Sequence, residues 1–335
     1  MTSTRRKPQT AVLVTGGAGY IGSHTCKALA QAGYFPVTID NLSRGHSSAV
    51  KWGPLIVGSV GDRDLLNSTM AEYHPAAVLH FAAFAYVGES VRNPAQYFRN
   101  NTCYSLTLLE ATRDHDIDAF VFSSTCAIYG IPQRIPIQEH DLQNPVNPYG
   151  QSKLMVEGML RSFDAAHGMR SISLRYFNAA GSDSEHEIGW SHDPETRLIP
   201  RALMAARGDL PHLEIFGGDL GTPDGTCVRD YIHVSDLARA HVLALQQLRS
   251  GSSSSTLNIG AGTGHSVHDV VNAVHRVTGM PVPIKIASRR TGDPAVLVAN
   301  SSQAKSVLKF TPVESSLDHI VQTAWEWMKR RSHAT

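Results

Sequence analysis

Thr15-Gly-Gly-Ala-Gly-Tyr-Ile-Gly22 is the stretch that decides the fold of this 335-residue chain. It follows the apolar run 11–14 and opens a helix-like segment that extends to Leu29. Glycine permits positive φ and lets the main chain approach a phosphate, while a helix N-terminus offers free N–H groups to an anion. Strand, glycine turn and helix in this order predict a site for a dinucleotide pyrophosphate, with Gly16, Gly19 and Gly22 as cofactor-binding residues.

An acidic residue stands where a ribose-binding carboxylate is expected. Asp40 ends the second apolar run, 36–39, and lies 18 residues after Gly22. A carboxylate at this place binds the adenosine ribose and repels a 2′-phosphate. We therefore expect NAD rather than NADP, although the nearby cation Arg44 makes this preference moderate. A tight turn without any ligand is the less favoured interpretation.

Apolar runs and helix-like segments alternate through the first half of the chain. Strands are expected near 11–14, 36–40, 55–59, 77–81, 119–122 and 171–177, with helices near 20–32, 62–73, 94–115 and after Asn147. This alternation predicts an α/β fold, a Rossmann-type doubly wound parallel sheet. Ligands of such sheets bind beyond the carboxyl ends of the strands.

The regular alternation stops after Asn178, and residues 180–230 are rich in Gly, Pro and Asp. A chain of this length favours two lobes. We expect an NAD-binding domain over 1–178, rejoined by about 230–262, where 256–259 resembles another strand. Residues 179–335 are expected to form a smaller, interleaved C-terminal α/β lobe that binds the substrate. Further helices are expected over 233–248, 263–278 and 315–329.

The composition excludes several classes of protein. The net charge is +1 without an evident basic face, so a nucleic-acid partner is not expected. No apolar run is long enough to span a membrane and no signal-type segment follows the N-terminus, so we expect a soluble cytoplasmic protein. The four cysteines have no CxxC spacing and none of the 17 histidines belongs to an HExxH motif. Neither a disulfide framework nor a metal site is expected.

Tyr149 and Lys153 are the candidates for chemistry. Asn147 is a good N-cap and Pro148 suits the first helical position, so Tyr149 and Lys153 lie one turn apart on one helix face. A phenol has a pKa near 10, and an ammonium group beside it, with a positive nicotinamide, would lower that pKa. Thr125, which follows the strand 119–122, could orient a substrate hydroxyl. Together they predict abstraction of a proton from a secondary alcohol whose hydride passes to NAD.

These motifs resemble the extended short-chain dehydrogenase/reductase superfamily. The similarity to its UDP-glucose 4-epimerase family is closer and covers nearly the whole chain. It rests on Gly19-Tyr-Ile-Gly-Ser-His-Thr-Cys26, Asp40-Asn-Leu-Ser43, Val87-Gly-Glu-Ser90, Asn147-Pro-Tyr-Gly150, Arg175-Tyr-Phe-Asn178, Asp224-Gly-Thr-Cys-Val-Arg-Asp-Tyr-Ile-His233 and Arg289-Arg-Thr-Gly-Asp293. The resemblance implies an isomerase that interconverts UDP-galactose and UDP-glucose. A tightly held NAD would take hydride from C4, and the 4-keto sugar would turn over before hydride returns to its other face.

The resemblance also implies roles for individual residues. Tyr149 would be the base, with Lys153 and Thr125 completing the catalytic set. The expected cofactor-binding residues, besides the glycines, Asp40, Tyr149 and Lys153, are Tyr20, Ile21, Asn41, Ser43, Phe81, Ala82, Asn100, Ser123 and Phe177. The expected substrate-binding residues, besides Thr125 and Tyr149, are Asn178, Arg197, Leu198, Phe216, Arg229, Arg290 and Asp293. Arginine suits a diphosphate because its planar fork donates two parallel hydrogen bonds. Without the resemblance, Arg229 beside Asp230 and Arg290 near Asp293 would be interpreted as surface ion pairs.

The chain departs from the family pattern at four positions. Ser59 replaces an acidic residue near the adenine, and Ala85 replaces a lysine that some members place over the cofactor phosphates. Arg197 and Leu297 differ near the sugar, which leaves the substrate range open. The segment 84–90 also resembles UDP-arabinose (UDP-xylose) 4-epimerases, so pentose nucleotides are alternative substrates. Because the substrate range is open, N-acetylglucosamine nucleotides are a further alternative.

Other functions are less favoured. The related 4,6-dehydratases carry an Asp-Glu pair directly after the threonine, and the related decarboxylases have Glu at the second position, whereas this chain has Cys126 and Ala127. A dehydrogenase that releases NADH is harder to exclude. A non-catalytic NAD-binding regulator would be expected to lack Tyr149 or Lys153. By analogy with the family, we expect a homodimer formed through the helices near 94–115 and 149–167.

Overall fold

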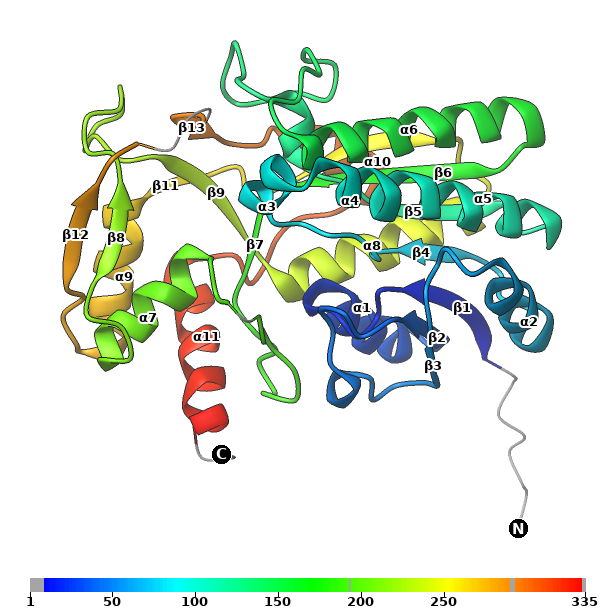
Figure 1. The fold of residues 1–335 in the computed structure, drawn as a ribbon, viewed down its shortest axis with the longest axis horizontal. Helices are drawn as coiled ribbons and strands as arrows, with labels where there is room; N and C mark the ends of the chain where they lie inside the picture. Colours follow the sequence, from blue (N-terminus) through cyan, green and yellow to red (C-terminus); the bar gives the residue numbers. More distant parts are fainter. Residues whose placement is uncertain (1–8, 193, 290–292, 333–335) are drawn as a thin grey trace.

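The computed structural model describes residues 9–192, 194–289 and 293–332. Its centre is a seven-stranded sheet in the order β10-β6-β5-β4-β1-β2-β3, with every neighbouring pair parallel (Figure 1). The strands are β1 (Thr10–Thr15), β2 (Tyr34–Asp40), β3 (Leu55–Val57), β4 (Val78–His80), β5 (Ala119–Ser123), β6 (Arg170–Tyr176) and β10 (Ser255–Ile259). The predicted Rossmann-type sheet is confirmed. The strand expected at 256–259 is β10, which pairs with β6.

Helices cover both faces of this sheet, as its apolar strands require. One face packs against α1 (Tyr20–Gln31), α8 (Val234–Arg249) and α10 (Ser302–Leu308), and the other against α2 (Arg63–Tyr73), α5 (Tyr104–Asp114) and α6 (Pro148–His167). Side chains of a strand alternate between faces. Accordingly, Val12 and Val14 belong to the core under α1 and α8, and Leu13 belongs to the core under α2 and α5.

Local capping determines where several helices begin. The Asp62 carboxylate accepts hydrogen bonds from the N–H groups of Asp64 and Leu65, and Asn147 Oδ1 accepts from Gly150 at 2.9 Å, with Pro148 at the first helical position. The helix predicted over 94–115 is more irregular than expected. It consists of α4 (Pro94–Tyr97), a π-helical turn (Phe98–Cys103) and α5, and it follows the short helix α3 (Val87–Arg92).

The second lobe lies beside the carboxyl ends of the sheet (Figure 1). One small sheet contains β7 (Asn178–Ala180), β9 (Val228–His233), β11 (Gly264–Ser266) and β13 (Val296–Leu297), and another pairs β8 (Leu213–Phe216) with β12 (Ile284–Ala287). The helices α7 (Leu198–Arg207), α9 (Val267–Thr278) and α11 (Leu317–Ser332) pack around a core of their own. Short 3-10 turns occupy Ser47–Ala49 and Cys126–Tyr129. Within the described residues, no helix combines the length and apolar character that crossing a membrane requires.

Candidate active site

The glycine turn between β1 and α1 is packed so tightly that side chains are excluded. Gly16 has a φ of +75°, and a Cβ placed there would lie 2.5 Å from the Ala82 nitrogen. A Cβ on Gly22 would lie 2.2 Å from the Gly16 carbonyl oxygen. Helix α1 has Gly19 as its N-cap residue, with no side-chain cap and no acidic residue in its first turn. No side chain caps the first N–H groups of α1, so these groups can donate hydrogen bonds to an anion. The turn therefore fits the pyrophosphate of a dinucleotide.

Asp40 lies directly beside this turn. Its side chain is buried, and its two oxygens accept hydrogen bonds from the backbone nitrogens of Ala18 at 3.0 Å and Leu42 at 2.8 Å. Burial raises the pKa of Asp40, and these two hydrogen bonds oppose that effect. A carboxylate can accept about four hydrogen bonds, so Asp40 can also accept from a ribose hydroxyl. In the same loop, Asn41 Oδ1 accepts from the backbone and the hydroxyl of Ser43 at 3.0 and 2.7 Å.

Thr125, Tyr149 and Lys153 are brought together at the carboxyl end of β5. All three are buried, and the Thr125 side chain lies close enough to the Tyr149 phenol to lower its pKa, against the larger effect of burial. Thr125 Oγ1 also accepts from the Ala127 nitrogen at 3.1 Å, which fixes its position at the start of the 3-10 turn. Lys153, one turn along α6 from Tyr149, donates from Nζ to the Ser123 carbonyl oxygen at 2.9 Å. A phenol, an aliphatic hydroxyl and a lysine amine therefore share one site.

The electrostatics of this site differ from the sequence-based expectation. Burial raises the pKa of Tyr149, whereas we expected Lys153 to lower it. Burial also lowers the pKa of Lys153 to about 7, against an opposing effect of the Glu157 carboxylate. The reason is that both groups are removed from water, which disfavours the charged form of each. In the chain alone, Tyr149 is a neutral phenol.

A buried ion pair behind the catalytic residues was not anticipated. Glu157, one turn beyond Lys153, accepts from Arg175 Nη2 at 2.6 Å, from Arg175 Nε at 3.0 Å and from Ser124 Oγ at 2.6 Å. Arg175 also donates to Tyr129 Oη and to the Glu139 carbonyl oxygen, each at 2.9 Å. Glu157 therefore joins α6 to the ends of β5 and β6. The only sequence signal was its position four residues after Lys153.

Asn101 is a second functional candidate that the sequence analysis missed. From the π-helical turn, its side chain hydrogen-bonds the backbone N–H and carbonyl of Phe84 at 2.9 and 3.0 Å, and donates to Ser152 Oγ at 3.1 Å. It thereby fixes the loop after β4 against the helix that carries Tyr149. Turns of π-helix are frequent at functional sites. The neighbouring Asn100, which we had selected as a cofactor ligand, donates to Asn101 Oδ1 at 2.9 Å.

The other predicted cofactor residues lie at the carboxyl ends of strands or at the start of α1. Phe81 follows β4 and packs against His241, with ring centroids 4.7 Å apart, and Ala82 lies against Gly16. Ser123 Oγ is 3.1 Å from Tyr176 Oη, and the Phe177 nitrogen donates to the Ile259 carbonyl oxygen.

The first two residues of α1 use their side chains elsewhere. The Tyr20 hydroxyl donates to the Gly181 carbonyl oxygen at 2.6 Å, and Ile21 packs against the core of the sheet. The Tyr20 side chain thus joins the two lobes and the Ile21 side chain packs in the core of the sheet. Only the backbone of these two residues is left to face the predicted anion site.

Arg229 does not pair with its sequence neighbour Asp230, the pairing that would be assumed without the family resemblance. Asp230 is buried and accepts hydrogen bonds from the backbone nitrogens of Ala261, Gly262 and Ala299 at 2.7, 3.0 and 3.1 Å. Arg229 Nη2 instead lies 2.5 Å from Asp293 Oδ1, because successive side chains of β9 point to opposite faces. Two residues predicted to hold UDP are therefore in direct contact. Arg290, the third, lies outside the described residues.

The remaining predicted substrate residues border the second lobe. Arg197 forms a bidentate ion pair with Glu195, at 3.0 and 2.7 Å, and its guanidinium lies 4.8 Å from the Tyr20 ring centroid. Leu198 begins α7, Asn178 begins β7, and Phe216 ends β8. Among the positions that depart from the family, Ser59 accepts from the Gly61 nitrogen and Leu297 packs in the cluster that contains Cys126.

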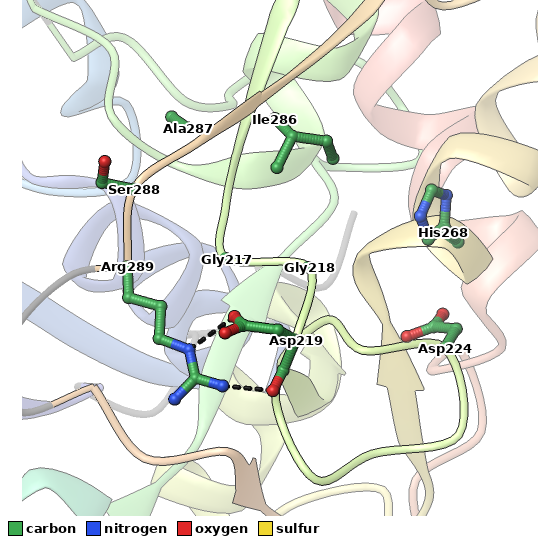
Figure 2. A pocket seen from close by; sticks show the side chains of 9 residues that line it. All are labelled: Gly217, Gly218, Asp219, Asp224, His268, Ile286, Ala287, Ser288 and Arg289. Atoms are coloured by element: carbon green, nitrogen blue, oxygen red, sulfur yellow. Dashed lines mark hydrogen bonds and ion pairs between the residues drawn. The ribbon is translucent and has the colours of Figure 1, made fainter.

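A surface pocket of about 490 Å³ lies next to Phe216, between the ends of β8 and β12. Figure 2 shows its lining, in which Arg289 Nε donates to Asp219 Oδ1 at 2.6 Å. The lining residues are Gly217, Gly218, Asp219, Asp224, His268, Ile286, Ala287, Ser288 and Arg289. Arg289, which lines the pocket, directly precedes Arg290 in the sequence, one of the residues predicted to bind UDP.

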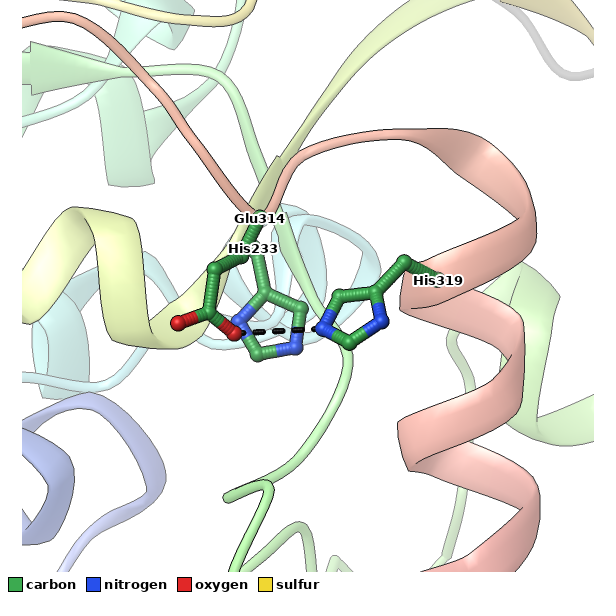
Figure 3. A group of neighbouring side chains, drawn as sticks. All are labelled: His233, Glu314 and His319. Atoms are coloured by element: carbon green, nitrogen blue, oxygen red, sulfur yellow. Dashed lines mark hydrogen bonds and ion pairs between the residues drawn. The ribbon is translucent and has the colours of Figure 1, made fainter.

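His233, Glu314 and His319 form a separate group of ionisable side chains (Figure 3). Glu314 Oε2 lies 3.1 Å from His319 Nε2. His233 Nδ1 accepts from the Ser235 nitrogen and so caps α8, and its Nε2 lies 3.0 Å from Thr323 Oγ1. Both ring nitrogens of His233 are thus engaged. The group serves to join β9, α8 and α11, since coordination of a cation by His233 would require loss of the helix cap or of the Thr323 contact.

Known proteins resemble the chain over nearly its whole length. Residues 12–260 match the NAD dependent epimerase/dehydratase family. A UDP-glucose 4-epimerase of Rhizobium leguminosarum bv. trifolii is 50% identical over 316 residues, covering 94% of this chain and 96% of the relative. The crystal structure of UDP-glucose 4-epimerase from Brucella ovis in complex with NAD is 52% identical, with a TM-score of 0.93 and coverage of 95% of this chain and 98% of that chain. The UDP-glucose-4-epimerase from Stenotrophomonas maltophila with bound NAD and formylated UDP-arabinopyranose is 40% identical, with a TM-score of 0.94 and coverage of 98% and 100%.

Proposed function

The chain belongs to the NAD dependent epimerase/dehydratase family, and from that premise we propose that it interconverts UDP-galactose and UDP-glucose by epimerisation at C4. The observation that carries the proposal is the union of Thr125, Tyr149 and Lys153 at the strand ends beside an uncapped helix N-terminus. Relatives that share half of the residues over nearly the full chain are UDP-glucose 4-epimerases.

The residues at the strand ends divide the chemical tasks. NAD, when bound, supplies the hydride acceptor for C4 and a positive ring that favours a phenolate nearby. Tyr149 takes the proton from the sugar O4 and later returns it, and Thr125, whose side chain lies near that phenol, orients the hydroxyl. Lys153 holds α6 against Ser123 and provides a cation whose pKa near neutrality lets it respond to charge in the site. The glycine turn and Asp40 hold the dinucleotide.

The second lobe is proposed to hold the uridine diphosphate. Arg229 is buried and already ion-paired with Asp293, so it is oriented before a diphosphate arrives. Asn178, Arg197, Leu198, Phe216 and Arg290 are proposed to complete this part of the site. Accordingly, we propose the domain division of the sequence analysis, residues 1–178 with about 230–262 for NAD and 179–335 for the nucleotide sugar. We also propose a cytoplasmic homodimer that acts in galactose metabolism.

A pentose nucleotide is the second candidate substrate. The segment 84–90 resembles UDP-arabinose 4-epimerases, and the Stenotrophomonas relative was crystallised with formylated UDP-arabinopyranose. Competition among UDP-galactose, UDP-N-acetylgalactosamine and UDP-arabinose, scored by kcat/KM, ranks the substrates.

The test of the reaction is turnover of UDP-galactose by purified protein without added NAD. Stoichiometric release of NADH with UDP-glucose would instead indicate a dehydrogenase. Tyr149→Phe is expected to lower kcat at least ~100-fold, as is typical for loss of an acid–base group. Tyr73→Phe on α2 is the matched control and should leave kcat unchanged. Equal turnover by Tyr149→Phe and the wild type would remove Tyr149 from the mechanism.

A further inference from the structure

Two loops border the glycine turn on opposite sides. The loop after β2 touches it at Ala18, whose carbonyl oxygen accepts from the His46 nitrogen at 3.0 Å. A Cβ on Gly45 would lie 2.8 Å from the Ala18 carbonyl carbon. The loop after β4 touches the other side, where Ala82 packs on Gly16. A dinucleotide bound at the turn therefore lies between these loops.

Arg44 joins the two loops. From the loop after β2, its Nη2 donates to Glu89 Oε1 in α3 at 2.7 Å. The guanidinium carbon also lies 5.6 Å from the Phe84 ring centroid and 5.1 Å from that of Tyr86. An arginine with a carboxylate and two aromatic faces is held by one ion pair and two cation–π contacts.

The residues that Arg44 contacts are themselves held by hydrogen bonds. The hydroxyl of the fully buried Tyr97 lies 2.8 Å from Glu89 Oε2 and accepts from the Tyr86 nitrogen at 3.0 Å. Asn101 holds Phe84 by its backbone. Arg44 therefore contacts residues that are held by Tyr97 of α4 and, through Asn101 and Ser152, by the helix bearing Tyr149.

The second lobe borders the space beside the glycine turn on a third side. His46 Nε2 lies 2.8 Å from the Ser191 carbonyl oxygen. The His192 ring makes edge contacts with Tyr86 and Tyr20, at centroid distances of 6.0 and 6.2 Å. The space beside the glycine turn is thus bordered by both loops and by the segment 191–192.

We propose that Arg44, Phe84, Tyr86 and Glu89 form a clasp that must open for NAD to enter or leave, and that this clasp retains the cofactor between turnovers. The inference rests on the proposed function only in placing NAD at the glycine turn. The clasp also accounts for Ala85. Some family members have at this position a lysine that lies over the cofactor phosphates, whereas here Arg44 supplies the positive charge from the opposite loop. Because Glu89 engages Arg44, this arginine serves the clasp and is not free to bind a 2′-phosphate.

The rate of NAD dissociation tests the clasp. Holoprotein is diluted into excess NAD-hydrolysing enzyme, and the NAD that remains with the chain is measured over time. Arg44→Gln is expected to release NAD at least about tenfold faster, and Arg44→Lys at an intermediate rate, because lysine keeps the charge but loses the planar stack. Arg63→Gln is the matched control, since Arg63 also carries a partly exposed ion pair, with Glu110, and lies on α2 away from the turn.

Two further measurements distinguish a clasp from a direct cofactor contact. A clasp slows entry as well as exit, so NAD association with the stripped Arg44→Gln chain should be as fast as or faster than with the wild type. Glu89→Gln, which weakens the ion pair from the other side, should reproduce the faster release. Salt should speed release from the wild type more than from Arg44→Gln, because the ion pair is partly exposed.

The proposal is overturned if Arg44→Gln and Arg63→Gln release NAD at the same rate, or if Arg44→Gln slows association, which would indicate a direct contact with the cofactor. It is also overturned if wild-type protein loses NAD during purification. With saturating NAD, the clasp variants should epimerise UDP-galactose at the wild-type rate. Failure of the wild type to epimerise UDP-galactose, while NAD retention still depends on Arg44, would refute the proposed function alone.

Discussion

Replacing Glu157 by glutamine would break the buried ion pair behind the catalytic residues. Its side chain is 1% exposed and that of Arg175 is 2% exposed, so neither group can turn to water when the other is neutralised. The substitution weakens contacts of 2.6 and 3.0 Å to Arg175 and leaves the guanidinium charge buried and uncompensated. Removal of one partner from such a pair costs about 3–5 kcal/mol of unfolding free energy. That is a large share of the roughly 5–15 kcal/mol that stabilises a typical protein.

Urea unfolding of the wild type and of Glu157→Gln measures this loss. Glu326→Gln on α11 is the matched control, because the Lys329–Glu326 pair is exposed and should change stability by less than about 1 kcal/mol. The double variant Glu157→Leu with Arg175→Met should recover most of the loss, since it leaves no unpaired charge. A loss below about 1 kcal/mol in Glu157→Gln would refute the assignment of a buried, uncompensated charge.

The same substitution has an expected effect on catalysis. The Glu157 carboxylate opposes the lowering of the Lys153 pKa to about 7 by burial. Without that negative charge the ammonium form is less favoured, so the pKa of Lys153 falls further. The alkaline limb of the kcat–pH profile should move to lower pH, which a purely structural role would not cause. An unmoved limb would show that Glu157 acts on stability alone.

The other predictions concern the glycine turn and the buried histidines. Gly22→Ala should destabilise the fold by about 1–3 kcal/mol and reduce the NAD content, since its Cβ would meet the Gly16 carbonyl oxygen at 2.2 Å. Gly158→Ala in α6 is the control and should stabilise the fold by up to about 1 kcal/mol. A Cβ at Gly158 would meet only an Arg161 side-chain nitrogen, at 3.8 Å, outside the local helix backbone. Equal stability changes in the two variants would contradict the packing argument. Four histidines of the described residues are buried, namely His24, His80, His233 and His241, and burial lowers the pKa of each to about 3 or 4. The unfolded chain protonates these histidines near pH 6.5, whereas the folded chain does so only at lower pH. Their contribution to the unfolding free energy is therefore complete above about pH 6.5. It is lost as the pH falls toward 4, by up to about 2 kcal/mol for each histidine at pH 5. A urea midpoint that stays constant from pH 8 to pH 5 would contradict this.

Local features of the fold could be predicted from the sequence because their causes are local. The glycine turn, the caps at Asp62 and Asn147 and the proline at the start of α6 depend on residues within a few positions of one another. The alternation of buried strands and helices follows from the apolar pattern, and the strand predicted at 256–259 is β10, although the sequence did not specify its pairing with β6. The second lobe was harder to predict, because strands of two to four residues such as β13 and β8 carry little pattern of their own.

The sequence by itself determined the glycine turn, the capped helix with Tyr149 and Lys153, and Thr125 after β5, since each depends on spacing along one element. Tertiary structure decided which charges meet. Arg229 binds Asp293, 64 residues away, rather than its neighbour Asp230, and Arg44 binds Glu89 across two loops. It also decided how far burial shifts the pKa values of Tyr149 and Lys153. The physical reason is that pairing and desolvation depend on which elements pack together, and residue spacing does not specify that.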